Sequence, residues 1–546
     1  MKLINLFFGV ILTFICFSHI TAQKVNIIPY PVEVVLGEDS LEINEDFKII
    51  SSSLDKESAS FLQRDIKDIS GINLELLEAK NGAENTIKFI IDQNLAKEAY
   101  ELQVGKSGVT ISASNSTGWF YGTQSLLQLI PFSALKEKSR TSFKIPLVSI
   151  KDSPRFSWRA YMLDEARYFK GMDQVKLLLD EMAFLKMNVF HWHLTDDAGW
   201  RIEIKKYPLL TEIGSKRKST QIGPEKWNSS IQSGEPHEGF YTQEEIKEIV
   251  EYASDRHITI VPEIEMPGHS SAAIAAYPWL GTNKDEIEVP IVFGVGTDVY
   301  DVADPIVYKF LTDVLDEVIA LFPSKVIHIG GDEVKYNHWK ESESVQAYMK
   351  ENNLETPAGL QVFFTNRISL YLQGKGRRMM GWNEIMGHNV HDYQDAKDTE
   401  SDQKLASNTV VHFWKGDIEK LTDAASNGYD IVNSLHSSTY LDYNYKSIPL
   451  KKAYSFDPIP EKLEPEFHDK VIGTGCQMWG EWIPTAGNMH FLTFPRIAAY
   501  SEVGWTRKVN KDYDHFKSSL VNLQERWTKK GIYYAPDSVT DIESKE

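Results

Sequence analysis

The sequence predicts an α/β protein in which a (β/α)8 barrel, the TIM-barrel fold, follows a small α/β sandwich domain. Two observations lead to this prediction. After residue 154, eight short apolar runs alternate with amphipathic helical stretches, which is the pattern of βα units around a parallel sheet. Polar and aromatic side chains recur directly after these runs, at the strand ends where a barrel carries its functional groups.

The predicted elements divide the chain into segments. Residues 23–150 form the sandwich domain, 151–508 the barrel, and 509–546 a C-terminal helix and tail. In the sandwich, strand-like runs cover 47–50, 86–91, 100–104 and 108–113, and helices cover 59–69 and 118–129. The eight barrel strands are expected at 158–163, 188–194, 258–262, 326–329, 378–381, 409–413, 431–434 and 471–477. Clear helices between them cover 173–186, 243–256 and 305–321, and the polar segment 389–407 is predicted as a surface loop or irregular helix.

The N-terminus has the pattern of a secretory signal peptide over residues 1–22. Lys2 precedes an apolar run that ends at Phe17, and a small, polar stretch follows with cleavage expected near Ala22. A membrane span is one alternative, but the run is short for a bilayer. A lipoprotein anchor at Cys16 is another. The sequence therefore predicts an exported protein, located in the periplasm, at the cell surface or in the medium.

Composition restricts the partners. The net charge of −19 without a basic stripe argues against nucleic acid as a partner. No later apolar run is long enough to span a membrane. Once a signal peptide is removed, Cys476 is the only cysteine, so no internal disulfide is expected. The oligomeric state stays open, with a homodimer as one possibility.

The two adjacent carboxylates Asp332 and Glu333 follow a buried strand and two glycines. A retaining glycosidase of the ordinary kind needs two carboxylates about 5 Å apart on opposite sides of the scissile bond. Neighbours at one strand end approach the substrate from the same side, so this pair is poorly placed to be an acid and a facing nucleophile. It suits one acid that protonates the leaving oxygen and one carboxylate that holds a nucleophile belonging to the substrate. The alternative is a pair of surface acids that cap the next helix.

The motif His-Ile-Gly-Gly-Asp-Glu at 328–333 resembles the glycoside hydrolase family 20 β-N-acetylhexosaminidases. Similar segments run from about residue 157 to 505, and they lie at 158–164, 188–201, 262–269, 381–384, 440–443 and 477–481. The sandwich domain also resembles the domain that accompanies this family. The resemblance implies an exo-acting, retaining hydrolase that releases terminal β-linked N-acetylhexosamine from an oligosaccharide or glycoconjugate, without a cofactor.

The resemblance also implies roles for single residues. Glu333 is the general acid and later the base, and Asp332 orients the 2-acetamido group, whose oxygen attacks the anomeric carbon to form an oxazolinium ion. Tyr440 binds the acetamido oxygen. Asp196 holds His269, which orients Glu333. Substrate hydroxyls and the acetamido methyl are expected to meet Arg159, Trp382, Trp414, Asp442, Trp479 and Glu481.

Some positions leave alternatives. Arg159 is equally compatible with a buried ion pair to Asp164, and a single barrel tryptophan often belongs to the core. The sequence departs from the family at Ala160, Glu265 and Asn383, where Gly, Asp and Asp are common. Because Glu265 lengthens a carboxylate near His269, the relay through His269 is the least secure assignment.

The His-Trp-His motif at 191–193 raises a metal site as an alternative, because other barrel hydrolases use His-x-His to bind zinc or iron. No further part of that pattern follows, so the sequence predicts no metal and assigns His191 and His193 to packing or to support of the residues that contact the substrate. A catalytically inactive glycan-binding barrel and a metal-dependent amidohydrolase are the competing functions.

Overall fold

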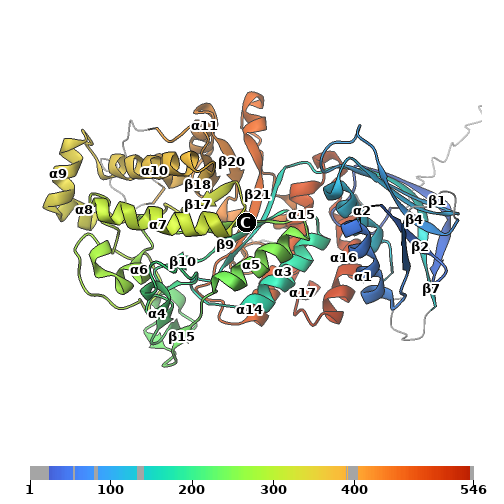
Figure 1. The fold of residues 1–546 in the computed structure, drawn as a ribbon, viewed down its shortest axis with the longest axis horizontal. Helices are drawn as coiled ribbons and strands as arrows, with labels where there is room; N and C mark the ends of the chain where they lie inside the picture. The colour runs from blue at the N-terminus through green and yellow to red at the C-terminus, as the bar shows by residue number, and fades with distance from the viewer. Residues whose placement is uncertain are drawn as a thin grey trace, which may run out of the picture.

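A computed structural model describes residues 24–52, 56–78, 84–131, 141–388, 390–391 and 404–541. The expected signal peptide at 1–22, with Cys16, lies outside the described residues, as does most of the segment 389–407. Figure 1 shows a barrel and a sheet side by side, with helices between them. In the described part of the chain, no helix is long and apolar enough to cross a membrane.

The N-terminal part is a seven-stranded sheet with two helices on the side toward the barrel (Figure 1). Its strands are β1 (Glu33–Asn44), β2 (Lys48–Ser51), β3 (Glu75–Glu78), β4 (Thr86–Ile91), β5 (Tyr100–Gly105), β6 (Gly108–Ala113) and β7 (Ser142–Asp152), in the order β1-β7-β5-β6-β4-β2-β3. Helix α1 (Lys56–Ser70) buries Ala59, Leu62 and Ile66, whose spacing puts them on one face. Helix α2 (Ser116–Gln128) is buried along nearly its whole length. The predicted α/β sandwich is confirmed.

Eight parallel strands close into the barrel that the sequence predicts. They are β8 (Trp158–Asp164), β9 (Val189–His193), β16 (Thr259–Glu263), β17 (Val326–His328), β18 (Arg378–Trp382), β19 (Val410–Phe413), β20 (Asp430–Asn433) and β21 (Val471–Met478). Each expected run overlaps one of them. Strand β21 pairs with β8 from Gly473–Trp158 to Met478–Leu163, which closes the barrel between its last and first strands.

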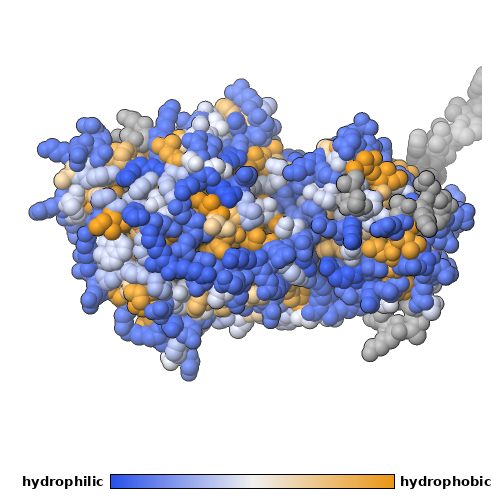
Figure 2. Space-filling view, in the orientation of Figure 1, coloured by the Kyte–Doolittle hydropathy of each residue, from blue (hydrophilic) through white to orange (hydrophobic). Residues whose placement is uncertain are grey.

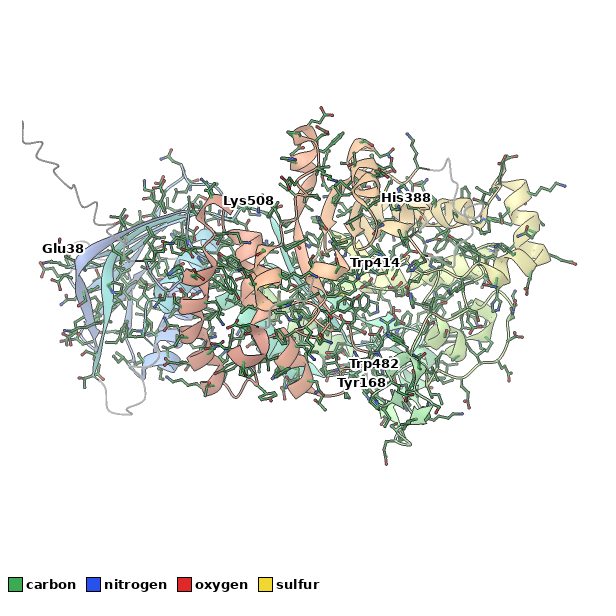
Figure 3. All side chains as sticks on the ribbon, turned by 180° about the vertical axis from the view of Figure 1, so that it is seen from behind. Glu38, Tyr168, His388, Trp414, Trp482 and Lys508 are labelled. Carbon is green, nitrogen blue, oxygen red and sulfur yellow. The ribbon has the colours of Figure 1, made fainter. Side chains whose placement is uncertain are left out.

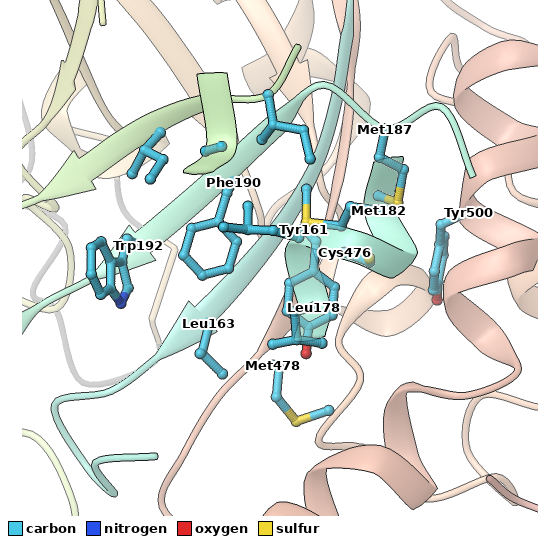
Figure 4. Packing of buried hydrophobic residues seen from close by; sticks show 14 of the residues in the cluster. Tyr161, Leu163, Leu178, Met182, Met187, Phe190, Trp192, Cys476, Met478 and Tyr500 are labelled. Carbon is cyan, nitrogen blue, oxygen red and sulfur yellow. The ribbon is translucent and has the colours of Figure 1, made fainter. Parts of the chain in front are cut away.

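Helices pack around the outside of the barrel because each presents an apolar face to the strands. The longer ones are α3 (Met172–Phe184), α5 (Gln243–Ser254), α7 (Pro305–Leu321), α10 (Pro357–Gly374), α11 (Ile418–Ser426) and α15 (Arg496–Trp505). Figure 4 shows Leu178 and Met182 of α3 beside Tyr161, Phe190 and Cys476 of the barrel strands. Burying one such side chain contributes roughly 1.5–3 kcal/mol. The face seen in Figure 2 is mainly hydrophilic, with apolar side chains in separate small patches.

Shorter elements build the loops and the C-terminal end. They are α4 (Leu209–Glu212), α6 (Ser271–Ala276), α8 (Asn337–Glu341), α9 (Glu343–Glu351), α12 (His436–Thr439), α13 (Leu450–Ser455), α14 (Ala486–Thr493), β10 (Thr195–Asp196), β11 (Gly199–Trp200), β12 (Lys216–Arg217), β13 (Gln221–Ile222), β14 (Ile231–Gln232) and β15 (His237–Glu238). Short 3-10 helices cover Lys226–Asn228, Pro278–Leu280, Asn383–Met386, Pro465–Lys470 and Lys508–Asn510. After the barrel come α16 (Tyr513–Lys529) and α17 (Asp537–Thr540).

A buried arginine joins the two parts. Arg159, the second residue of β8, is 1% exposed, and its guanidinium lies 3.0 Å from Oε1 of Glu98 in the N-terminal part. The same guanidinium donates to the hydroxyl of Tyr121 at 3.0 Å and to the carbonyl oxygens of Phe156 at 2.7 Å and Lys186 at 2.9 Å. Every donor group of this side chain is therefore occupied at the junction between sheet and barrel.

Replacing Arg159 by Met is expected to lower the free energy of unfolding by roughly 3 kcal/mol, because Glu98 and two carbonyl groups lose a charged donor. Urea unfolding followed by tryptophan fluorescence measures this loss. Lys151→Met is the matched control, since Lys151 and Glu101 form an exposed pair at 3.3 Å whose loss costs less than about 1 kcal/mol. Equal losses in both variants would contradict the junction role of Arg159.

Candidate active site

A cavity of about 620 Å³ opens at the carboxyl ends of the barrel strands. Segments that follow all eight strands contribute its lining, as expected where parallel strands end on the same side. The lining residues are Arg167, Asp196, Lys226, Trp227, Glu265, His269, Gly294, Val295, Asp332, Glu333, His391, Trp414, Lys415, His436, Tyr440, Asp442, Tyr443, Asn444, Ser447, Trp479, Glu481 and Trp482. Nine of the eleven expected site residues are among them; Arg159 and Trp382 are not.

A glycine turn after β17 brings Asp332 and Glu333 into this cavity. Gly330 has a φ of +63°, and a Cβ at this position would stand 1.7 Å from Oε2 of Glu265, so only glycine fits. Glu333 itself has a φ of +53°, an unfavourable backbone conformation for a non-glycine residue. Glu265, one of the departures from the family pattern, accepts a hydrogen bond from the amide of Gly331 at 3.3 Å. The turn therefore packs against Glu265 and directs both carboxylates to the cavity.

His269 connects two of the expected carboxylates. Its Nδ1 lies 3.3 Å from Oδ1 of Asp196 and 3.3 Å from Oδ2 of Asp197. Its Nε2 lies 3.5 Å from Oε2 of Glu333. The guanidinium of Arg167 lies 2.8 Å from Oδ2 of Asp196 and fixes the far side of that carboxylate. The structure thus brings Asp196, His269 and Glu333 together in the order that the resemblance implies.

The neighbours of these groups determine where protons reside. Burial raises the pKa of Asp332 well above its usual value, and the charge of Glu333 adds to this effect. Burial also acts on Glu333, but the hydrogen bond and charge of His269 outweigh it and hold the pKa of Glu333 below its usual value. Burial of His269 lowers the pKa of its imidazole, but the charge of Asp196 outweighs this effect and raises that pKa well above the ordinary range. In the free protein Asp332 and His269 therefore keep their protons to higher pH than usual, and Glu333 loses its proton more readily than usual.

Glu333 has a second imidazole neighbour, His391, in the segment that the sequence predicts as a surface loop. Nε2 of His391 lies 3.5 Å from Oε1 of Glu333 and 3.2 Å from Oε1 of Glu384. The other oxygen of Glu384 accepts the backbone N–H of Glu333 at 3.2 Å. His391 comes nine residues after the end of β18, too far from the strand end for the sequence pattern to identify it.

Arg167 lies among the polar groups at another part of the cavity. Its guanidinium lies 3.3 Å from Oδ2 of Asp164, 2.8 Å from Asp196 and 3.9 Å from Oε1 of Glu481. Burial and the negative charge of Glu481 raise the pKa of Asp442 to about 8. Burial likewise raises the pKa of Glu481, although Arg167 opposes the shift. These groups form a set of charged donors and acceptors suited to sugar hydroxyls.

The predicted sugar-binding role of Arg159 is wrong. As the second residue of β8 it lies at the amino end of that strand, where Glu98 occupies its guanidinium, so neither the cavity nor Asp164 is its partner. The arginine in the cavity is Arg167, which follows the carboxyl end of the same strand and pairs with Asp164 at a spacing of three residues. Position along the strand distinguishes the two arginines.

Aromatic side chains enclose the cavity near Asp332. The rings of Trp414 and Tyr440 are stacked with centroids 6.2 Å apart, and the ring of Trp479 lies 5.9 Å from Tyr440. Among the described residues, Nε1 of Trp414 and Oδ1 of Asp332 are buried without a hydrogen-bond partner. Buried polar groups are normally paired, so these atoms are available to a ligand.

The prediction that Trp382 forms a pocket wall is also corrected. Trp382 has 0% exposure, its Nε1 donates to Oε1 of Glu263 at 2.9 Å, and its ring stacks on His412 at 4.1 Å. The side chain lies in the barrel interior, where its ring centroid is 6.5 Å from Trp414 and 5.7 Å from Trp479. Trp382 therefore supports the aromatic walls from behind.

Loop residues complete the mouth of the cavity. Trp227 lies in the segment between β12 and β15, and its ring meets Trp482 edge-on at 5.3 Å. The ring of Phe293 also meets Trp482 edge-on, with centroids 5.3 Å apart. Figure 3 labels Trp482 and Trp414 in the barrel part of the molecule. The mouth therefore has an aromatic surface that extends outward from the cavity.

In the described residues, several groups of histidines and carboxylates have possible metal-ligand atoms within 4.8 Å of one another. One group consists of His191, Glu263 and His328. Zinc bonds of about 2.0–2.1 Å would hold ligand atoms roughly 3.3 Å apart. The atoms here are closer: 2.9 Å between His191 and Glu263, and 2.6 Å between His193 and Glu263. The shorter distance is a hydrogen bond between Nδ1 of His193 and Glu263, and the longer one is a close contact between imidazole and carboxylate.

Comparison with known proteins identifies relatives over most of the chain. The β-hexosaminidase of Porphyromonas gingivalis is 36% identical over 529 residues, which cover 94% of this chain; this chain spans only 64% of the length of that relative. The crystal structure of an exo β-N-acetylglucosaminidase of Vibrio harveyi with N-acetylglucosamine matches with a TM-score of 0.80 at 31% identity, covering 95% of this chain and 80% of that one. A chitobiase of Flavobacterium johnsoniae matches with a TM-score of 0.77 at 32% identity, over 93% and 73% of the two chains.

Two family descriptions match consecutive parts of the sequence. The catalytic domain of glycosyl hydrolase family 20 matches residues 156–508, which include every barrel strand and the whole lining of the cavity. Domain 2 of the same family matches residues 24–153, the sheet and its two helices. On these matches, the chain belongs to glycosyl hydrolase family 20.

Proposed function

We propose that this protein is an exo-acting, retaining β-N-acetylhexosaminidase that releases terminal β-linked N-acetyl-D-glucosamine or N-acetyl-D-galactosamine from glycans. The observation that carries the proposal is the delivery of Asp332 and Glu333 from a single turn after β17. Because both approach from the same side, the nucleophile comes from the substrate. The names of the relatives, including a β-hexosaminidase and an exo β-N-acetylglucosaminidase, support this activity.

The mechanism follows from the positions of these groups. Protonated Glu333 gives its proton to the glycosidic oxygen as the bond from that oxygen to the anomeric carbon breaks. The acetamido oxygen attacks the anomeric carbon, and Asp332 accepts the acetamido N–H and stabilises the oxazolinium charge. Glu333 then takes a proton from water, whose oxygen attacks the same carbon and restores the acetamido group. Two displacements at one carbon retain the configuration.

Substrate binding redistributes the protons of the free site. The acetamido N–H donates to Asp332, which favours the ionised form of that carboxylate. A negative Asp332 next to Glu333 raises the pKa of Glu333 and moves the proton to the acid that needs it. His269, held by Asp196, remains beside Glu333 through both steps.

The remaining lining residues explain the specificity for a terminal sugar. Tyr440 donates to the acetamido oxygen, and Trp414 and Trp479 enclose the methyl group and exclude water. Arg167 and Glu481 meet hydroxyls of the terminal ring, together with Asp442. The terminal sugar ring thus binds next to charged groups at the closed end of the cavity, and the rest of the glycan extends through the aromatic mouth.

The competing functions have less support. An inactive glycan-binding barrel does not require the acid, its two imidazole neighbours and the strained backbone of Glu333. If the protein were a metal-dependent amidohydrolase, chelators would abolish turnover. If the substrate's acetamido group is the nucleophile, activity is unchanged in their presence.

We also propose that the enzyme is exported and acts in the periplasm, at the cell surface or outside the cell. The support is the basic, apolar and small-residue pattern of residues 1–22. A homodimer is compatible with this proposal and is tested by the mass of the protein in solution.

Substrates that lack the 2-acetamido group are expected to be cleaved at least about 100-fold more slowly than matched N-acetyl-β-hexosaminides, because the internal nucleophile is missing. Release of nitrophenol from 2-acetamido and 2-hydroxy glycosides measures the ratio. A thiazoline analogue of the oxazolinium ion is expected to bind more tightly than N-acetylglucosamine. Equal rates on the two glycosides would exclude substrate assistance.

Glu333→Gln is expected to lower kcat by about 10²–10⁴-fold, the contribution of a positioned general acid. The loss is larger for chitobiose than for a nitrophenyl glycoside, because a sugar alkoxide needs the proton and nitrophenolate does not. Steady-state kinetics on both substrates measures the difference. Glu341→Gln, on the exposed surface of α8, is the control with unchanged kcat. The same loss on both substrates would contradict acid catalysis by Glu333.

Asp442→Asn is expected to raise the Tm of the free protein relative to wild type by more at pH 8 than at pH 4.5. It is also expected to lower turnover. The pKa of Asp442 is about 8 in the folded state against an ordinary 3.8, so the folded state binds the extra proton between these values. The stabilisation from Asp442 is therefore complete below about pH 4 and is lost as pH rises to 8. Thermal unfolding at both pH values tests this: an identical difference in Tm between wild type and variant at the two would refute the shift.

A further inference from the structure

A second group of ionisable side chains lies inside the barrel beneath the cavity, and the mechanism above does not use it. Glu263 and His193 extend inward from the neighbouring strands β16 and β9, and each has 0% exposure. Substrate does not reach them. Buried charges of this kind are costly unless they are paired, so their arrangement calls for a physical reason.

His193 is bound by a carboxylate at each ring nitrogen. Its Nδ1 lies 2.6 Å from Oε2 of Glu263, and its Nε2 lies 3.0 Å from Oδ2 of Asp196. Carboxylates only accept hydrogen bonds, so an imidazole that satisfies both must carry two protons and a positive charge. Burial opposes that charge, but Glu263 outweighs it, and the pKa of His193 rises to about 10.

This imidazolium lies at the start of a continuous path to the catalytic acid. His193 and Arg167 both bind Oδ2 of Asp196, and Oδ1 of the same carboxylate accepts the backbone N–H of Asp197 at 2.6 Å and lies 3.3 Å from Nδ1 of His269. Nε2 of His269 then meets Glu333 at 3.5 Å. A charged His193 is therefore one of three donors, with Arg167 and the backbone N–H of Asp197, that fix the rotation of Asp196 and through it the direction of His269.

We propose that Glu263 is a positioning residue for the catalytic acid: it holds His193 as an imidazolium, which orients Asp196 and, through His269, the carboxyl group of Glu333. Glu263 acts at a distance, through three intervening side chains, and touches neither the substrate nor Glu333. This inference rests on the proposed hydrolase function, because Glu333 must be the acid whose proton is positioned.

Other charged groups face the path and enter its titration. Arg167 lies 3.4 Å from Nε2 of His193, Glu265 lies 3.9 Å from its Nδ1, and Asp164 adds negative charge. Around Glu263, the ring nitrogens of His191 and His328 lie 2.9 Å away. Burial lowers the pKa of His328 to about 4, and the pKa of His412 behind it lies well below its usual value for the same reason. His193 is therefore the cation that the carboxylate of Glu263 stabilises on this path.

Glu263→Gln tests the proposal. The variant keeps the size of the side chain and removes the charge, so the pKa of His193 falls toward the ordinary value near 6.5. We expect kcat to fall by about 10- to 100-fold, the effect of removing an outer carboxylate that orients a functional histidine. KM stays within about twofold, and the kcat–pH profile gains a new ionisation between about pH 6 and 7, where His193 now titrates. Glu263→Asp keeps the charge and is expected to lack the new ionisation.

His412→Asn is the matched control. It removes an equally buried imidazole that contacts His328 at 3.2 Å and Ser434 at 2.8 Å, off the path to Glu333, so its kcat–pH profile stays that of the wild type. A folded Glu263→Gln enzyme with the wild-type profile would overturn the proposal. The same new ionisation in His412→Asn would also overturn it, because any disturbance of the barrel interior would then suffice.

Proton NMR of the wild-type protein gives an independent readout if Glu263→Gln does not fold. The two N–H protons of His193, assigned by their loss in His193→Gln or by selective labelling, are expected to persist downfield from pH 5 to 9. Loss of one signal near pH 6.5 would refute the imidazolium. A wild-type enzyme that leaves N-acetyl-β-hexosaminides intact would instead refute the proposed function, and the NMR signals would still report the charge of His193.

Discussion

The closure of eight parallel strands is the constraint on which the rest of this structure depends. In a closed parallel barrel every strand ends on the same side, so residues far apart in sequence meet at one mouth. Asp196, Glu333 and Glu481 follow three different strands and are brought to a single cavity in this way. The same closure excludes water from them, which raises the free energy of each ionised carboxylate. The nearest cation therefore determines whether that carboxylate is ionised.

Three cations resolve this crowding of negative charge. Arg167 serves Asp164, Asp196 and Glu481 together, His193 lies between Asp196 and a deeper carboxylate, and His269 serves the acid itself. Each of these cations contacts more than one carboxylate, so none of the carboxylates named here has a cation to itself. Rearranging one charge therefore affects the others, and the acid belongs to a connected electrostatic unit that extends well below the surface it presents to substrate.

The sequence was sufficient for the barrel because each strand is a short apolar run and polar groups mark its end. It was sufficient for Glu333 and Asp332 because two glycines followed by two acids, directly after a buried strand, predict a tight turn that carries both carboxylates. It was insufficient for Arg159 and Trp382, since a pattern does not tell which end of a strand a side chain occupies or how deep it lies. His391 was missed because a polar segment is typical of a surface loop, and only the folded chain returns it to the acid.

The arginine at the junction has a consequence for moving this barrel between proteins. Glu98 belongs to the N-terminal part, yet it neutralises a guanidinium that the first barrel strand carries at its buried end. A barrel transplanted alone would keep this charge but lose its counterion, so the graft would need either a carboxylate supplied by its new neighbour or an apolar residue in place of Arg159. Exchanging either part therefore requires a compensating change in the other, because the two share this ion pair.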